Sequence, residues 1–155
     1  ISSGGVHNIC IVQDYPNTLS YDLFKHFSKG NLFCDVEFQY EGDPVWPKAI
    51  RAHSFLLAAR SPLFAKELKS QPKENRVITI RDCSIRAFRT LLVYLYTDDI
   101  KIIEEVKDCD VLVEILKQAK KHKLPKLLDF CEIQFKTIIF NRFNSEQTRI
   151  PFTEL

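Results

Sequence analysis

The sequence predicts an α+β fold, in which a few short strands accompany a larger set of helices. Residues 34–40, CDVEFQY, alternate apolar and polar side chains, as a half-buried strand does. Residues 76–80, RVITI, are rich in β-branched side chains and indicate a further strand. Elsewhere between residues 54 and 135, many apolar residues recur at helical spacing. The expected order is one helix, a strand hairpin, two helices, one strand and three helices.

An amphipathic helix is expected first, within residues 18–30. Thr18 or Ser20 can cap its start, and Gly30 can end it. Its apolar stripe consists of Leu19, Leu23, Phe24 and Phe27. From the residues alone two alternatives stay open, because the stripe can pack either on its own domain or against a partner.

The strand hairpin is expected to have a wide loop. Gly42, Pro44 and Pro47 interrupt regular structure, and residues 49–53, AIRAH, resume an extended run. Trp46 lies in this loop. We expect Trp46 to anchor the loop by packing, an exposed contact with another protein being the alternative.

The helices that follow the hairpin have recognisable starts. Residues 54–60 are short and apolar, and Ser61 and Pro62 begin a second helix with an N-cap and a proline at the first helical position. The last three helices are expected to begin after Ser84 or Asp82, after Asp110, and at Leu124 and Pro125.

The chain divides into three parts on these patterns. Residues 1–16 are expected to form a flexible lead-in or linker, and residues 17–135 one domain. From about Lys136 the apolar pattern weakens, so residues 136–155 are expected to be a C-terminal extension or the start of a following region. The chain contains no methionine, even at position 1, and we therefore expect it to be a module of a longer protein.

The composition fits one globular domain of 155 residues and narrows the functional classes. A formal net charge of +2 does not indicate a nucleic-acid partner. No apolar run approaches the roughly 18 residues that a membrane span needs, and no secretory signal is recognisable. Five cysteines, widely spaced and without a C-x-x-C pair, are typical of reduced thiols. We expect a cytoplasmic or nuclear protein with no membrane partner.

The residues offer little for catalysis or for a cofactor. None of the four glycines belongs to a phosphate-binding fingerprint, and the four histidines and the cysteines lack the spacing of zinc ligands. A cysteine nucleophile served by His53 or His122 stays open, because such residues need only meet in space. No glycine-bearing turn surrounds any cysteine, however. We expect no enzyme activity, no metal and no cofactor.

One basic cluster, KQAKKHKLPK, occupies residues 117–126. It can contact phosphates, or it can be a solvated helix end and turn. We expect the second, because the cluster lacks the interleaved aromatic residues that favour single-stranded nucleic acid.

Four segments resemble the BTB/POZ domain family, both in sequence and in order. They are CDVEF, AHSFLLAARSPLF, ITIRDCSIRAFRTLLVYLYTDDI and LLDFCEIQF, and the resemblance covers residues 17–135. It implies the BTB/POZ fold, a helical cluster flanked by a small mixed β-sheet. It also implies a role in protein assembly without catalytic activity.

The resemblance assigns roles to two polar residues. In the family the residues that match Asp35 and His53 are largely buried determinants of the fold. We therefore expect His53 to be structural rather than a ligand or a catalyst. It would lie at a junction between strand and helix, where its ring can hydrogen-bond to unpaired backbone groups at the helix start.

The resemblance also indicates two binding surfaces. Many members dimerise through the helix that precedes the first strand, which here carries the stripe defined above, and this favours a homodimer. A large branch recruits a cullin scaffold of ubiquitin ligases. The matching positions here are Phe64, Leu68, Lys69 and Ser70. The signature of that branch is an apolar residue, any residue, then glutamate, and this chain has Ser70 in place of the glutamate.

A second branch of the family consists of transcription factors that bind co-repressors. Their pocket uses a basic residue directly after the motif histidine, where this chain has Ser54. The sequence therefore favours a self-associating adaptor that brings a substrate, held by other domains, to a cullin-RING ubiquitin ligase. The alternative is a homodimerising scaffold or transcriptional-regulator module that does not bind cullin.

Overall fold

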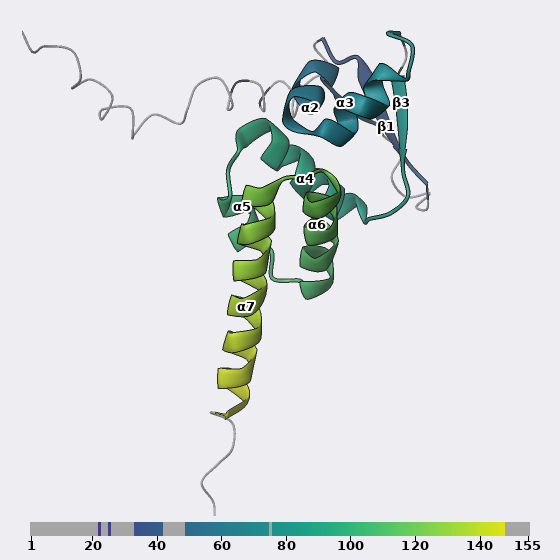
Figure 1. Ribbon diagram of the computed structural model, residues 1–155. Helices are drawn as coiled ribbons and strands as arrows, with labels where there is room; N and C mark the ends of the chain where they lie inside the picture. The colour runs from purple at the N-terminus through teal and green to yellow at the C-terminus, as the bar shows by residue number, and fades with distance from the viewer. Residues whose placement is uncertain (1–21, 23–24, 26–32, 42–48, 75, 148–155) are drawn as a thin grey trace, which may run out of the picture.

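The computed structural model describes residues 22, 25, 33–41, 49–74 and 76–147 of the chain. In chain order the described elements are β1 (Val36–Tyr40), β2 (Ile50–Ala52), α2 (Ser54–Arg60), α3 (Pro62–Lys69), β3 (Arg76–Ile80), α4 (Ile85–Thr97), α5 (Lys101–Glu104), α6 (Cys109–Lys121) and α7 (Pro125–Gln147). The strands lie beside α2 and α3 at one end, α4 runs through the middle, and α6 and α7 pack side by side at the other end (Figure 1). The predicted α+β class is confirmed.

The three described strands form one mixed sheet in the order β2-β1-β3. Strand β1 pairs antiparallel with β2, where Phe38 faces Ile50, and parallel with β3, where Phe38 faces Ile78. Val36 and Phe38 are buried and Glu37 and Gln39 are more exposed, which is the alternation that predicted the strand.

The core joins this sheet to the helices through aromatic rings. The Phe38 ring centroid lies 5.7 Å from that of Phe64 on α3 and 4.8 Å from that of Phe88 on α4. Such tilted and edge-to-face pairs stabilise a core by about 0.5–1.5 kcal/mol beyond the area they bury. Helix α4 is the centre of the core, since Leu91 and Leu92 have no exposed surface.

Two predicted helix starts occur as expected. The Ser61 hydroxyl accepts the backbone N–H of Phe64, with Pro62 at the first position of α3. The Ser84 hydroxyl accepts the N–H of Ala87 at the start of α4. These caps depend on residues three positions apart, which is why the sequence signals them.

Two other helices differ from the prediction. Helix α6 begins two residues earlier than expected, at Cys109, because Asp108 rather than Asp110 accepts the first free N–H groups of the helix. The four-residue helix α5 was not predicted, since a single turn is too short to show a helical period.

Helix α7 continues beyond the point where the apolar pattern weakens. It runs for 23 residues to Gln147 and extends past the N-terminal end of α6 (Figure 1). The segment from Lys136 to Gln147 contains no glycine or proline, so nothing in it breaks a helix. Ile139, Phe140 and Phe143 are exposed on it. No helix in the described ranges is long and apolar enough to span a membrane.

Candidate interaction surface

The four positions that match the cullin-binding segment do not lie on one surface. Phe64 and Leu68 lie on the inner side of α3 and are buried in the core. Lys69 and Ser70 are exposed at the C-terminal end of the helix. Contact of these four residues with cullin stays a prediction, and in this chain Phe64 and Leu68 hold α3 in place while Lys69 and Ser70 face the solvent.

The exposed end of α3 has a defined geometry. The Ser70 backbone N–H and hydroxyl both donate to the Glu67 carbonyl, at 3.2 and 2.7 Å. The Arg76 Nε donates to the Pro72 carbonyl at 3.2 Å and so holds the following turn. Lys69 and Ser70 thus lie at a helix end where the Glu67 carbonyl accepts two hydrogen bonds.

A buried polar pair fixes the start of α3. The Ser61 Oγ lies 2.8 Å from His122 Nδ1, and the Phe64 and His122 rings are 4.4 Å apart. Burial, followed by the charge of Lys121, lowers the pKa of His122 to about 4. The imidazole is therefore neutral at pH 7, and it accepts the Ser61 hydroxyl hydrogen while that oxygen accepts the Phe64 N–H.

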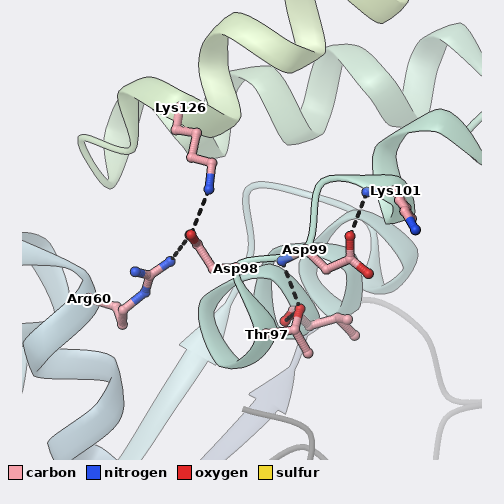
Figure 2. A network of polar contacts seen from close by, with 7 residues as sticks. Arg60, Thr97, Asp98, Asp99, Lys101 and Lys126 are labelled. Carbon is pink, nitrogen blue, oxygen red and sulfur yellow. Dashed lines mark hydrogen bonds and ion pairs between the residues drawn. The ribbon is translucent and has the colours of Figure 1, made fainter. Parts of the chain in front are cut away.

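An ionic network ties α2, α4 and α7 together (Figure 2). The Asp98 carboxylate accepts from Arg60, and from Lys126 Nζ at 2.7 Å. Asp98 ends α4 in the left-handed conformation, with φ of 55°. Partial burial would raise the pKa of Asp98, but the hydrogen bonds from Lys126 and Arg60 outweigh it and lower that pKa. Figure 2 also shows Asp99 accepting the Lys101 N–H at the start of α5.

His53 is buried at the junction between β2 and α2, but its ring does not cap the helix. Its Nδ1 lies 2.7 Å from the Tyr96 hydroxyl on α4, and its Nε2 lies 3.8 Å from Cys34 Sγ. The expectation that the ring bonds to the helix start is wrong, because the ring turns toward α4. His53 does meet a cysteine, but burial, then the charge of Asp35, raises the pKa of Cys34. An activated nucleophile would show the opposite shift.

Asp35 performs the capping that His53 does not. Its carboxylate accepts the Ser54 N–H at 2.7 Å and the Ser54 hydroxyl at 2.5 Å, at the first residue of α2. It also accepts from Arg76 Nη1 at 3.0 Å, which links it to β3. The expected burial of Asp35 is not observed, since 42% of its side chain is exposed. Desolvation would raise the Asp35 pKa, but the Ser54 bonds and the Arg76 charge outweigh it and lower that pKa.

The residues of the predicted dimer stripe, Leu19, Leu23, Phe24 and Phe27, lie outside the described residues, as does Trp46. Among the described residues, Phe33 is 85% exposed, and Phe55, on α2, is 64% exposed. Sequence patterns gave no signal for these two exposed rings. In the described ranges no group of three histidine, cysteine or acidic residues could hold a metal ion.

Comparisons with known proteins agree with this architecture. The family model of the BTB/POZ domain matches residues 24–139. The chain belongs to the BTB/POZ domain family. BTB domains are protein–protein interaction modules, and this chain carries such a module. The resemblance stated above and the expected fold are thereby confirmed.

Relatives of this BTB domain occur in plants and animals. A BTB/POZ domain-containing protein of Arabidopsis thaliana is 33% identical over 107 residues, which are 68% of this chain and 42% of the relative. The BTB/POZ and MATH domain-containing protein 4 of the same plant is 32% identical over 128 residues, covering 72% of this chain and 26% of the relative. The chain thus spans less than half the length of these two relatives.

Two solved BTB domains share the fold. The BTB domain of zebrafish PATZ1 is 21% identical, with a TM-score of 0.60, and the match covers 76% of this chain and 88% of that domain. The BTB domain of human Gigaxonin is 20% identical, with a TM-score of 0.53, over 76% of this chain and 92% of that domain. At this identity the likeness concerns the fold alone.

Proposed function

We propose that this BTB domain self-associates and serves as a substrate adaptor for a cullin-RING ubiquitin ligase. It would do so as part of a longer protein in the cytoplasm or nucleus, with other domains holding the substrate. The observation that carries the proposal is the exposed end of α3, where Lys69 and Ser70 face the solvent above the buried Phe64 and Leu68. This is the segment through which the cullin-binding branch of the family acts.

The hydrogen bonds at both ends of α3 support a binding role. Ser61 and His122 hold its start, and the bonds from Ser70 to Glu67 hold its end. A surface that is already ordered loses little conformational entropy when a partner binds. Lys69 would supply the charged contact, and Ser70 would occupy the position of the signature glutamate.

Two exposed rings support self-association. Phe33 and Phe55 expose 85% and 64% of their surface. Burial of exposed aromatic rings against a partner subunit is energetically favourable. Phe55 lies on α2, directly after the His53 junction. It would take part in self-association together with the expected stripe of Leu19, Leu23, Phe24 and Phe27.

The alternative is a homodimerising scaffold or a transcriptional-regulator module without cullin binding. The serine at position 70 favours the scaffold, because it lacks the charge of the signature glutamate. The co-repressor branch is less well supported, since Ser54 stands where that branch has a basic residue and its polar groups are bound to Asp35.

The test is calorimetric titration of a purified cullin N-terminal region into this chain, with light scattering on each component. We expect binding at micromolar or tighter affinity that Lys69→Glu weakens and that the control Lys117→Glu, an exposed charge reversal on α6, does not. The buried Leu68 is unsuitable for this test, because its substitution would disturb the core. A folded dimer that does not bind cullin would overturn the adaptor role and leave the scaffold.

Light scattering tests the second half of the proposal. A dimeric mass that Phe55→Glu converts to a monomeric mass would support self-association through this face. The exposed Phe140 on α7 provides the matched control, since Phe140→Glu should leave the mass unchanged. A monomeric wild-type chain at all protein concentrations would overturn self-association.

A further inference from the structure

An open groove lies between α4 and α5, and no residue of α3 contributes to it. Its volume is about 430 Å³. That volume lies within the roughly 300–1,000 Å³ of sites that hold small ligands or a few side chains. The lining residues are Ile85, Arg86, Arg89, Thr90, Val93, Ile102 and Glu105.

The floor of the groove is apolar. Ile85 and Val93 on α4 and Ile102 on α5 are each partly buried, so they present hydrocarbon to the groove and not only to the core. The Thr90 hydroxyl donates to the Arg86 carbonyl at 3.0 Å within the helix. Because this hydroxyl hydrogen is bonded within α4, Thr90 offers no free donor to the groove and adds little polarity to its floor.

The rim of the groove is mainly basic. Arg86 and Arg89 are exposed on α4, and Glu105 is exposed on the opposite side, at the end of α5. The Arg86 side chain is 65% exposed and forms an ion pair with Asp108, in which Nη1 lies 3.9 Å from Oδ2. An exposed ion pair of this length contributes little stability, so a carboxylate from another molecule can compete for the guanidinium.

We propose that this groove binds a short acidic segment of a partner protein, with an apolar side chain inserted over Ile85, Val93 and Ile102. Carboxylates beside that side chain would pair with Arg86 and Arg89. Glu105 would repel an acidic residue at the α5 side and so fix the direction of the segment. No lining residue is aromatic, which disfavours nucleic-acid bases that would need a stacking platform.

This proposal is independent of cullin binding, since it concerns different residues. The test begins with a phage-displayed library of random peptides, panned against the purified chain. We expect enriched peptides to combine one large apolar residue with aspartate or glutamate beside it. Synthetic copies carrying fluorescein would then be titrated by fluorescence anisotropy at low and high salt, and salt should weaken their binding.

Three variants decide whether the groove is the site. The double variant Arg86→Glu and Arg89→Glu should weaken binding at least about tenfold, because attraction becomes repulsion. Thr90→Arg fills the groove while adding positive charge, so it should also weaken binding if insertion matters. The matched double variant Lys117→Glu and Lys120→Glu reverses two exposed charges on α6 and should leave binding unchanged. Circular dichroism confirms that each variant is folded.

The remaining outcomes contradict the proposal. Enriched peptides without acidic residues, or binding that survives Arg86→Glu with Arg89→Glu, would remove the charge complementarity on which it rests. Equal losses in the α6 control would show non-specific attraction of acidic peptides. Retained binding in Thr90→Arg would place the peptide elsewhere, and a library that yields no binders would show that the groove takes no such segment.

Discussion

The His53 Nδ1 lies 2.7 Å from the Tyr96 hydroxyl, and this contact joins the start of α2 to the last turn of α4. The same hydroxyl accepts the backbone N–H of His53 at 3.0 Å. Each donor of His53 and Tyr96 in this contact has a partner if the hydroxyl donates to Nδ1 and the ring proton sits on Nε2, toward Cys34. One tyrosine oxygen therefore satisfies both the backbone and the ring of His53.

Replacement of Tyr96 by phenylalanine should destabilise the domain by about 2 kcal/mol, because two buried polar groups of His53 lose their partner. The free energy of unfolding is measured by urea denaturation followed by circular dichroism. Tyr40→Phe is the control, since Tyr40 is partly buried and packs against the core, and we expect it to change stability by less than about 0.5 kcal/mol. Equal losses in the two variants would contradict the role given to the Tyr96 hydroxyl.

Asp35→Ala should lower the free energy of unfolding by about 1–2 kcal/mol at pH 7, because α2 loses the acceptor at its first N–H. Asp35→Asn keeps an acceptor oxygen and loses only the charge, so it should be destabilised less. The folded pKa lies below the ordinary 3.8, so the carboxylate stabilises the domain above that pH and this stabilisation is lost as the pH falls through the folded pKa. Urea denaturation at pH 7 ranks the two variants, and equal stability of Asp35→Ala and the wild type would contradict the capping role.

His122 should make the domain less stable in mild acid. Its pKa is lowered from 6.5 to about 4, so between these values the unfolded chain binds a proton that the folded chain does not. This one group should therefore cost about 2 kcal/mol of stability between pH 7 and pH 5. The carboxylates of Asp35 and Asp98 reduce stability only at lower pH, because their pKa values in the folded chain lie below 3.8.

The measurement for His122 is urea denaturation at several pH values between 7 and 5, with His122→Asn as the comparison. Asparagine can still accept from the Ser61 hydroxyl but cannot be protonated in this range. We expect the variant to be less stable than the wild type at pH 7, because it fills less of the buried site, and to lose less stability on acidification. Identical slopes would show that His122 does not titrate on unfolding.

Local signals made much of this fold predictable. Ser61 and Pro62 mark the start of α3, and the alternation around Val36 and Phe38 marks β1, because caps and strands depend on neighbours a few positions away. The cap of α2 could not be predicted, since Asp35 is 19 positions from Ser54 and only the β1–β2 pairing brings them together.

The candidate surface was less predictable than the fold, for the same reason. Helical spacing placed Leu68 on α3, but only the packing of α3 shows that this side chain is buried while Lys69 is exposed. The groove between α4 and α5 also had no sequence signal, because the short helix α5 contributes Ile102 from a segment with no measurable period.

The end of α3 provides a gain-of-function prediction. Ser70→Glu supplies the glutamate of the cullin-binding signature at an exposed position, so it should change stability by less than about 0.5 kcal/mol and tighten cullin binding by about tenfold. Ser70→Gln has the same shape without the charge and should give no such gain in calorimetry. Leu68→Asp should instead unfold the domain, because it buries an unpaired carboxylate beneath the same helix. If Ser70→Glu remains folded and binds cullin no better than Ser70→Gln, the end of α3 does not contact cullin as the signature implies.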